Sequence, residues 1–180
     1  FHPHPRKIVK PNESLMQLTT MEERIELLKK LGINNMVIVP FTKDFSQQTA
    51  LEYVHHFLVD KFSPATIIIG YDHKFGNNRE GDFKLLEQYA AQFHYTVQEI
   101  DEELINNAII SSTKIREALL RGDVTLARAF LGYDYFFKGE VIEGNKLGRS
   151  IGYPTANLQM DNPDKLIPGN GVYAVTCQLE

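Results

Sequence analysis

The chain has 180 residues, of which 43% are hydrophobic and 23% are charged, and its formal net charge is −4. This composition is that of a globular protein, and the length allows one large domain or one medium domain with part of another. The acidic balance excludes a general nucleic-acid binder, so any phosphate site must be local. The single cysteine, Cys177, excludes an internal disulfide and a zinc site made of cysteines.

The strongly apolar runs, of which Thr66–Ile69 is an example, have the length of β-strands, and no signal peptide is visible. We therefore expect a cytoplasmic protein without membrane or nucleic-acid partners. The chain begins at Phe1 rather than at a methionine and ends in a β-type run, Val172–Leu179. We expect it to be a piece of a longer protein, cut at both ends.

The segment Phe1–Pro5 contains two prolines, which predict an extended conformation outside any helix. His2 and His4 would share one face of such a segment. Two histidines without a nearby carboxylate favour a loop that lines a pocket over a metal site.

From Phe1 to about Leu131, predicted helices alternate with predicted strands. Helices are expected to begin at the capping boxes after Thr20 and Thr49, and again near Asp82. Short apolar runs predict the strands Met36–Val39, Ala65–Ile69 and Tyr95–Val97. This alternation is typical of a parallel α/β sheet with right-handed crossovers.

The helix after Thr49 carries apolar residues at helical spacing. We expect it to bury Leu51, Val54, Leu58 and Phe62. The adjacent His55 and His56 fall on or near its polar flank, where solvated histidines are the usual case.

Three polar segments stand at strand-to-helix junctions: Phe1–Pro5, Gly70–Gly76 and the turn at Ser111. Ligands of parallel sheets bind at the carboxyl ends of the strands. We therefore expect the three segments to line one shared cleft.

The stretch Ile110–Arg116 is the most distinctive of these. Ser111, Ser112 and Thr113 precede a helical pattern, where a hydroxyl group caps backbone N–H groups. The same N–H groups and the helix dipole also bind phosphate, and Arg116 adds a fork of donors suited to phosphate oxygens. Two interpretations stay open: an ordinary N-cap with a surface arginine, or an anion site for a nucleotide.

A change in the sequence after Gly132 indicates a second domain. Asp123 is expected to cap a short last helix of the first. Beyond Gly132, glycines separate the β-type runs Tyr135–Phe137, Val141–Ile142 and Val172–Leu179, and no helical period is seen. We expect residues 1–132 to form the α/β domain and residues 133–180 to belong to an all-β domain.

Within the second domain, Gly144–Leu158 is rich in glycine, which lets backbone N–H groups approach an anion closely. Lys146 and Arg149 add positive charge. If the following segment is extended, the Thr155 hydroxyl and the Asn157 amide point the same way and offer oxygen ligands for Mg²⁺ held with nucleotide phosphates. A hairpin turn with polar decoration explains the stretch equally well.

One stretch resembles the signature of riboflavin kinases: Gly148–Leu158, Gly-Arg-Ser-Ile-Gly-Tyr-Pro-Thr-Ala-Asn-Leu, and Gly171–Val175 resembles the strand entry that follows it there. Ile110–Arg116 resembles the second motif of the adenylyltransferase module of FAD synthetases. Two further segments, Phe1–Pro5 and Gly70–Gly76, resemble the other parts of the active site of that module. Because the motifs are in the right order, the chain resembles the bacterial bifunctional riboflavin kinase/FAD synthetase family.

The resemblance implies a nucleotidylyltransferase (Rossmann-like) fold followed by part of a riboflavin kinase β-barrel. It also implies two reactions. ATP phosphorylates riboflavin to FMN in the barrel, and a second ATP adenylylates FMN to FAD in the α/β domain. Mg²⁺ would be the cofactor, and the partners would be small molecules: ATP and the flavins.

The resemblance further implies roles for individual residues. The ATP phosphates of adenylyl transfer would be held by Ser111, Ser112, Thr113 and the catalytic Arg116. The flavin would be lined by His4, Pro5, Asp72 and Phe75. The ATP phosphates of the kinase would be bound by Gly144, Lys146, Gly148, Arg149 and Thr155, under a loop that runs to Gly152. Mg²⁺ would be held by Thr155 and the catalytic Asn157.

Three departures from the family pattern bear on activity. The adenylyltransferase segment Gly-x-Phe-Asp…His-x-Gly-His is missing, and the chain ends before the glutamate base of the kinase, for which Glu180 lies too close to the metal motif. His73 stands where the family usually has phenylalanine. We therefore expect this chain to catalyse neither reaction well, and its parent protein to catalyse both.

Two alternatives stay open. Another small-molecule nucleotidylyltransferase would share the Ser-Ser-Thr-x-x-Arg turn but would lack the Pro-Thr-Ala-Asn β domain. A non-catalytic flavin or nucleotide sensor would carry both modules and bind flavin without turnover.

Overall fold

The structure, a computed structural model, describes residues 1–12, 15–102, 104–105 and 108–179; Glu180, weighed above as a kinase base, lies outside them. The chain forms two compact units. The first comprises Phe1–Ser14 and Val37–Ile109, and the second comprises Leu15–Met36 and Ile110–Glu180. The expected functional division after residue 132 stays a prediction.

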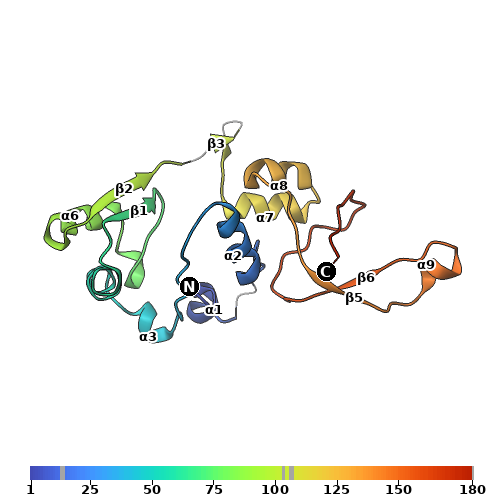
Figure 1. Cartoon of the computed structure of the whole chain (residues 1–180), viewed down its shortest axis with the longest axis horizontal. Helices are drawn as coiled ribbons and strands as arrows, with labels where there is room; N and C mark the ends of the chain where they lie inside the picture. The colour runs from blue at the N-terminus through green and yellow to red at the C-terminus, as the bar shows by residue number, and fades with distance from the viewer. Residues whose placement is uncertain (13–14, 103, 106–107, 180) are drawn as a thin grey trace. The chain divides into compact units, whose positions relative to one another are not determined.

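In the first unit, β1 (Thr66–Gly70) and β2 (Thr96–Ile100) form a parallel pair in which Thr66 lies opposite Thr96. The connection between them contains α6 (Phe83–Phe93), which packs along β2 (Figure 1). This arrangement confirms the predicted parallel α/β pattern and two of the three predicted strands. The unit also contains β3 (Leu104–Ile105) and β4 (Ala108–Ile109), which pair antiparallel.

The core of the first unit joins this sheet to its helices. Its buried residues are Val54, Ile69, Leu86 and Tyr95. The Tyr95 hydroxyl donates to the Leu86 carbonyl at 2.8 Å, so this buried polar group has a hydrogen-bond partner. Burial raises the pKa of the Tyr95 phenol. As predicted, α6 starts near Asp82, which is its N-cap and whose carboxylate accepts from the Leu85 N–H at 3.1 Å.

The helix after Thr49 is built in three parts: α4 (Ala50–Glu52), the π-helical segment η1 (Tyr53–Val59) and α5 (Asp60–Phe62). Its start confirms the predicted capping box, because Thr49 Oγ1 accepts from the Glu52 N–H at 3.2 Å. A π-helical turn holds more residues than an α-helical one, so the face that contacts the core drifts from the 3.6-residue pattern.

The burial expected for this helix is therefore only half right. Val54 is fully buried, and Leu58 packs against the core. Leu51 and Phe62 are 40% and 44% exposed, so the prediction of their burial is wrong. Ala50 takes the buried position at the start of the helix, and the π-helical turn rotates Phe62 off the core face.

Two expectations for the N-terminal half are also wrong. Phe1–Pro5 does not stay outside helices, because α1 (Pro5–Val9) starts at Pro5, where a proline is well tolerated. Met36–Val39 is not a strand. The described chain places only a single parallel bridge beside it, between His2 and Pro40, and a strand forms only where a partner offers a ladder. The unit is completed by α3 (Lys43–Ser46) and the one-turn η2 (Asn77–Arg79).

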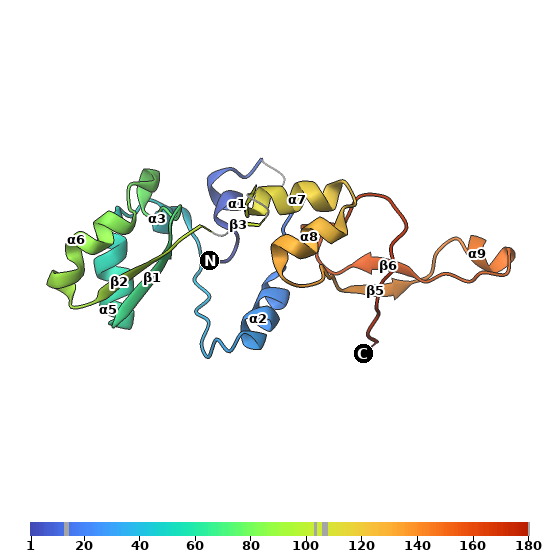
Figure 2. The ribbon, with the colours of Figure 1, turned by 90° about the horizontal axis from the view of Figure 1, so that it is seen from above.

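The second unit is built on three helices, α2 (Met21–Lys30), α7 (Ser112–Leu120) and α8 (Val124–Leu131), and Figure 2 shows α7 beside α8. Its core contains Ile115, Ala118, Leu119, Ala127 and Leu166. The predicted caps at Thr20 and Asp123 are confirmed. Gly132 ends α8 with a φ of 77°, a conformation that favours glycine.

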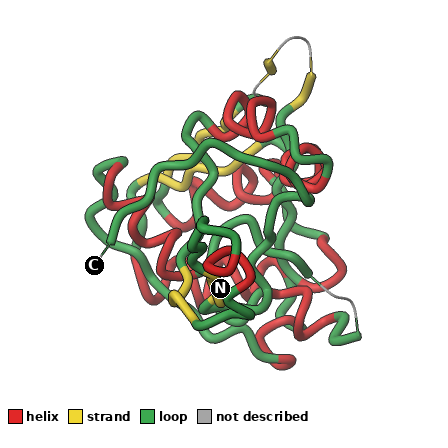
Figure 3. Tube along the Cα trace, turned by 90° about the vertical axis from the view of Figure 1, so that its right-hand side faces the viewer, coloured by secondary structure: helices red, strands yellow, loops and turns green. Residues whose placement is uncertain are grey.

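The C-terminal part of this unit contains the antiparallel pair β5 (Gly139–Ile142) and β6 (Asn157–Met160). Their long connection carries one unpredicted helical turn, α9 (Leu147–Ser150), as Figure 2 shows. Val141–Ile142 is a strand as expected, whereas Tyr135–Phe137 and Val172–Leu179 are not. In Figure 3 the strands are short yellow pieces separated by longer green loops. Among the described residues, no helix has the length and apolar character needed to cross a bilayer.

Candidate functional site

The start of α7 is an ordinary helix cap in its hydrogen bonding. Ser111 Oγ accepts from the Lys114 N–H at 3.3 Å, and Ser112 and Thr113, both exposed, are the first helical residues. The predicted N-cap is thus confirmed. The next N–H groups along the exposed first turn point toward the helix start, as an anion site requires.

Arg116 is held in place one turn into this helix. Its Nε donates to the Met16 carbonyl at 2.9 Å, which ties α7 to the segment before α2 within the second unit. Sequence reasoning missed this contact, since it joins residues 100 positions apart. An arginine fixed through Nε presents its remaining N–H groups in a defined direction. A phosphate-binding role for Arg116 stays a prediction.

The loop expected to line the flavin, Gly70–Gly76, is fixed near its C-terminal end. Phe75 and Gly81 exchange two backbone hydrogen bonds, of 3.0 and 2.9 Å. The Phe75 ring lies against Gly81, where a Cβ atom would collide with it. Asp72 is exposed on the same loop, and its charge helps to raise the pKa of Tyr71, although desolvation is the larger cause. The loop thus presents a rigid phenylalanine and an accessible carboxylate.

His73 stands in this loop where the resemblance leads us to expect phenylalanine. Its ring is nearly parallel to that of Phe75, with centroids 6.4 Å apart and planes 27° apart. An imidazole in this position keeps a flat face beside Phe75, as a flavin-stacking residue would need.

His4 and Pro5 lie in the first unit, as do Asp72 and Phe75, while Ser111–Arg116 lies in the second. His4 Nδ1 accepts from the Arg6 N–H at 3.2 Å and caps α1, and Pro5 is the first helical residue. Both residues therefore have structural roles that the sequence did not suggest. The shared cleft stays a prediction.

We predict a pH-dependent stability contribution from Asp82, which pairs with Lys74 at 2.8 Å beside the loop. The Lys74 hydrogen bond, and then the Leu85 N–H, lower the pKa of Asp82 from its usual value of 3.8. The stabilisation is therefore full above that value and is lost as the pH falls through the lowered pKa.

In Asp82→Asn the cap is retained and the ion pair is lost. We expect the variant to melt below the parent chain at neutral pH, with the difference vanishing in acid. Thermal melts at a series of pH values test this, and a difference that persists unchanged in strong acid would contradict it.

The glycine-rich stretch of the second unit encloses a cavity of about 310 Å³ at the end of the β5–β6 hairpin. Five of the predicted kinase residues line it: Gly144, Lys146, Arg149, Thr155 and Asn157. The remaining walls come from neighbouring residues to which sequence reasoning gave no binding role: Val141, Ile142, Glu143, Pro154 and Ala156. The structure thus brings together residues that were selected by sequence alone.

Two glycines are required by the packing of this cavity. A Cβ on Gly144 would collide with the Asn157 amide, which lies directly against the Gly144 backbone. A Cβ on Gly148 would lie 3.2 Å from Thr155 Oγ1 and would collide with the Tyr153 carbonyl. The loop therefore approaches Thr155 and Asn157 closely because it has no side chains at these two points.

Lys146, one of the two cations that line the cavity, is paired with a carboxylate in this conformation. Lys146 Nζ lies 2.5 Å from Glu143 Oε1, and both side chains are largely exposed. A phosphate would compete with Glu143 for the ammonium group. Thr155 and Asn157 offer a hydroxyl and an amide, which are neutral oxygen donors. Such donors suit Mg²⁺ only when phosphate oxygens complete its shell, so the residues fit a magnesium–nucleotide complex rather than the bare ion.

Comparison with known proteins agrees with these features. The FAD synthetase family model matches residues 1–114, and the riboflavin kinase model matches residues 131–180. The chain belongs to the FAD synthetase family. The resemblance stated from the sequence motifs is thereby confirmed, and so is the fold class, a parallel α/β part followed by antiparallel strands of a riboflavin kinase segment.

Several curated relatives share the name bifunctional riboflavin kinase/FMN adenylyltransferase. The protein of Buchnera aphidicola subsp. Schizaphis graminum is 39% identical over 97% of this chain and 56% of its own length. The Listeria monocytogenes protein is 38% identical over 97% of this chain and 55% of its own length. The Escherichia coli K12 protein is 31% identical over 97% of this chain and 55% of its own length. The chain thus spans a little over half the length of the relatives it matches.

A solved structure from Streptococcus pneumoniae, described as a macrolide-efflux protein, superposes with a TM-score of 0.84. It is 30% identical in sequence and covers 94% of this chain, which in turn covers 55% of that protein. The chain fold described above is therefore one that has been observed by crystallography.

Proposed function

We propose that this chain is part of an enzyme of FAD biosynthesis, which phosphorylates riboflavin to FMN and adenylylates FMN to FAD with ATP. The observation that carries the proposal is the order of the two family matches, FAD synthetase and then riboflavin kinase. The same two activities are joined in the names of the sequence relatives.

Adenylyl transfer is proposed to use the start of α7. Ser111, Ser112 and Thr113 would offer N–H and hydroxyl donors to the ATP phosphates, and Arg116 would stabilise the charge that develops on them. His4, Pro5, Asp72 and Phe75 are proposed to contact the flavin. The fixed Phe75 ring and the accessible Asp72 carboxylate support this assignment, since flavin rings combine flat apolar faces with polar edges.

Riboflavin phosphorylation is proposed to use the cavity at the β5–β6 hairpin. Gly144 and Gly148 would let the backbone approach the ATP phosphates, and Lys146 and Arg149 would neutralise their charge. The domain division at residue 132 belongs to this proposal. Thr155 and Asn157 would hold Mg²⁺, which supplies charge neutralisation when it is bound with the nucleotide.

The setting of these reactions follows from their reactants. ATP is the co-substrate of both steps, so we propose a cytoplasmic location. The net charge of −4 supports small-molecule partners over nucleic acid.

Two measurements test the proposal. Fluorescence titration of this chain with riboflavin and FMN, with and without Mg-ATP, reports flavin binding. Chromatography of flavins formed by the native protein that carries this sequence reports turnover. We expect flavin binding, FMN formation from riboflavin and FAD formation from FMN. Binding without either product would favour a flavin sensor, and FAD formation without FMN formation would remove the kinase half.

Arg116 offers a separate test of the adenylyl-transfer half. Arg116→Ala is expected to slow FAD formation from supplied FMN by about a hundredfold, the effect of losing one preorganised donor. Arg116→Lys should restore only part of the rate, because an ammonium lacks the planar fork of donors. Equal rates in all three proteins would remove Arg116 from the site.

A further inference from the structure

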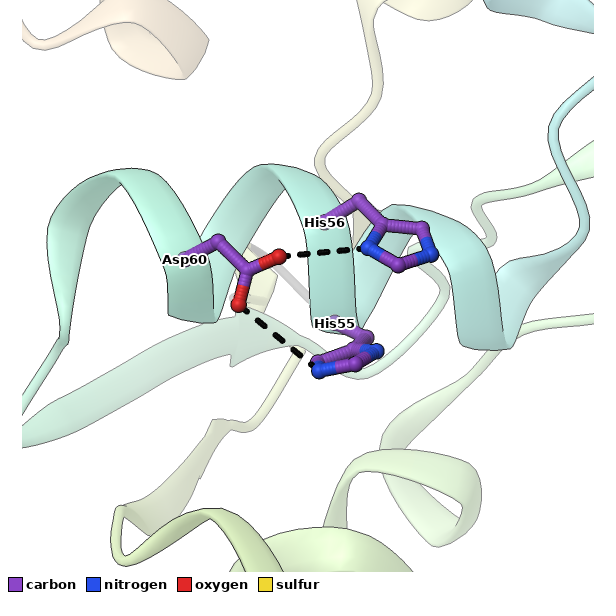
Figure 4. A group of neighbouring side chains, drawn as sticks. All are labelled: His55, His56 and Asp60. Carbon is purple, nitrogen blue, oxygen red and sulfur yellow. Dashed lines mark hydrogen bonds and ion pairs between the residues drawn. The ribbon is translucent and has the colours of Figure 1, made fainter.

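Three exposed side chains of types that can ligate metals lie together in the first unit and have no part in the proposed flavin chemistry. His55, His56 and Asp60 each offer a ligand atom, and these atoms lie within 4.8 Å of one another. Figure 4 shows both imidazole rings beside the Asp60 carboxylate. His56 Nδ1 is 3.1 Å from one carboxylate oxygen, and His55 Nε2 is 3.7 Å from the other.

The π-helical turn brings the three residues together. The Asp60 N–H donates to the His55 carbonyl, so Asp60 stacks five positions after His55 while it remains next to His56. In a regular α-helix, residues four apart are neighbours, and residues five apart point in different directions. A regular helix would therefore pair Asp60 with His56 and leave His55 aside. The local widening converts a pair into a triad.

The ligand atoms of the triad lie near the spacing that a metal ion requires. Zinc bonds to imidazole nitrogen and carboxylate oxygen are about 2.0–2.2 Å long, which places tetrahedral ligands about 3.3–3.5 Å apart. The observed separations of 3.1 and 3.7 Å lie near that spacing, and they join the two histidines to different oxygens of the carboxylate. The three ligand atoms lie within 4.8 Å of one another, so small side-chain rotations would bring them to a common ion. The 3.7 Å separation between His55 Nε2 and Asp60 is too long for a hydrogen bond, so Asp60 does not hydrogen-bond His55.

The rings are also oriented by their surroundings. The His55 ring stacks on Phe93 of α6, with centroids 5.0 Å apart and planes 17° apart. The two imidazole rings are 4.5 Å apart. About half of each side chain is exposed, at 45% for His55, 61% for His56 and 51% for Asp60, so an ion can enter from solvent. Ordering of the ligands in advance reduces the entropy lost on binding.

We propose that His55, His56 and Asp60 bind one divalent transition-metal ion, with Zn²⁺ preferred and with solvent water completing the shell. Two imidazoles and one carboxylate form a donor set that suits Zn²⁺. Mg²⁺ instead prefers ligands that are all oxygen atoms. The site is therefore distinct in chemistry from the magnesium–nucleotide site. The bound ion cross-links the π-helical turn that carries the buried Val54.

Calorimetric titration of the chain with Zn²⁺, and visible absorption after titration with Co²⁺, test the proposal. We expect one ion per chain, a tetrahedral Co²⁺ spectrum and a higher melting temperature with Zn²⁺. His55→Ala, His56→Ala and Asp60→Asn should each weaken the affinity at least about tenfold and abolish the thermal shift. His94→Asn is the matched control, because it removes an exposed histidine at a left-handed position that asparagine tolerates.

Two results would overturn the proposal. One is the failure of Zn²⁺ to bind the parent chain. The other is binding of equal affinity in the double variant His55→Ala/His56→Ala, which would assign the ion to other residues such as His2 and His4. Because alanine is a strong helix former, the variants are expected to keep the helix, and circular dichroism checks that they do. None of these readouts depends on flavin turnover.

Discussion

Replacing Lys165 with alanine should destabilise the second unit by about 3–5 kcal/mol, the usual cost of removing one partner from a buried ion pair. Lys165 Nζ lies 2.6 Å from Glu23 Oε2, and the two side chains are 1% and 2% exposed. The ammonium also donates to the Leu18 carbonyl at 2.8 Å and lies 4.3 Å from the centre of the Tyr135 ring. Without Lys165, the Glu23 carboxylate would be buried with no opposite charge.

The surroundings of the pair show why its loss is costly. Burial lowers the pKa of Lys165, and the Glu23 carboxylate opposes that shift. Burial, together with the Glu23 charge, raises the pKa of the Tyr135 phenol, whose hydroxyl donates to the Leu166 carbonyl at 2.7 Å. Three elements of the second unit therefore depend on one buried charge pair: α2, the segment at Tyr135 and the loop at Lys165.

Urea unfolding followed by far-UV circular dichroism measures the effect. Lys30→Ala is the matched control, because Lys30 pairs with Glu26 on the surface of α2, the helix that carries Glu23. Surface ion pairs contribute little to stability. The double variant Glu23→Gln/Lys165→Met should regain much of the lost stability, since it removes both charges and glutamine still completes the capping box. A Lys165→Ala midpoint equal to that of Lys30→Ala would contradict the prediction.

The buried pair also marks the limit of what the sequence predicts. Glu23 is visible in the sequence as the third residue of a capping box, and that role is confirmed by a 3.2 Å bond from its N–H to Thr20 Oγ1. Its second role joins it to a residue 142 positions away, and no local pattern points to such a partner. Helix starts were predictable because a cap is made by residues three apart.

Strands were predicted less well for a related reason. Ala65–Ile69 and Met36–Val39 are both apolar runs of strand length, yet only the first overlaps a paired strand, Thr66–Gly70. An apolar run is necessary for a strand, and the partner that makes it a strand lies elsewhere in the chain. The π-helical turn at Tyr53–Val59 likewise had no sequence signal, and it decides both the exposure of Phe62 and the His55–Asp60 contact.

The candidate binding residues that line the cavity at the β5–β6 hairpin were selected from motifs rather than from periodicity. Glycine density and the Thr155–Asn157 spacing selected the stretch, and its resemblance to riboflavin kinases assigned the roles. Sequence reasoning missed Glu143, which pairs with Lys146, because a carboxylate in an anion-binding loop is unexpected. Roles for the motif residues stay predictions, and Asn157 offers the sharpest test of them.

Replacing Asn157 with alanine should slow riboflavin phosphorylation by about a hundredfold or more, which is typical for the loss of one preorganised group that stabilises transition-state charge. The Asn157 amide packs against Gly144 and lines the cavity, so its oxygen is held in one place before the nucleotide binds. Its loss would remove one of the two neutral donors proposed for Mg²⁺. Turnover is measured as FMN formation by the native protein, and Mg-ATP affinity by calorimetry on this chain.

Asn145→Ala is the matched control, because it removes the same side chain from an exposed position of the same loop that does not line the cavity. Its FMN formation should equal that of the parent protein. Gly148→Ala should give an intermediate loss, since its Cβ would press on the Thr155 hydroxyl and the Tyr153 carbonyl.

FAD formation from supplied FMN should be unchanged in Asn157→Ala, because adenylyl transfer is assigned to the start of α7. If Asn145→Ala and Asn157→Ala lose FMN formation equally, the loop has a general structural role, and the specific assignment of Asn157 to the magnesium–nucleotide complex fails.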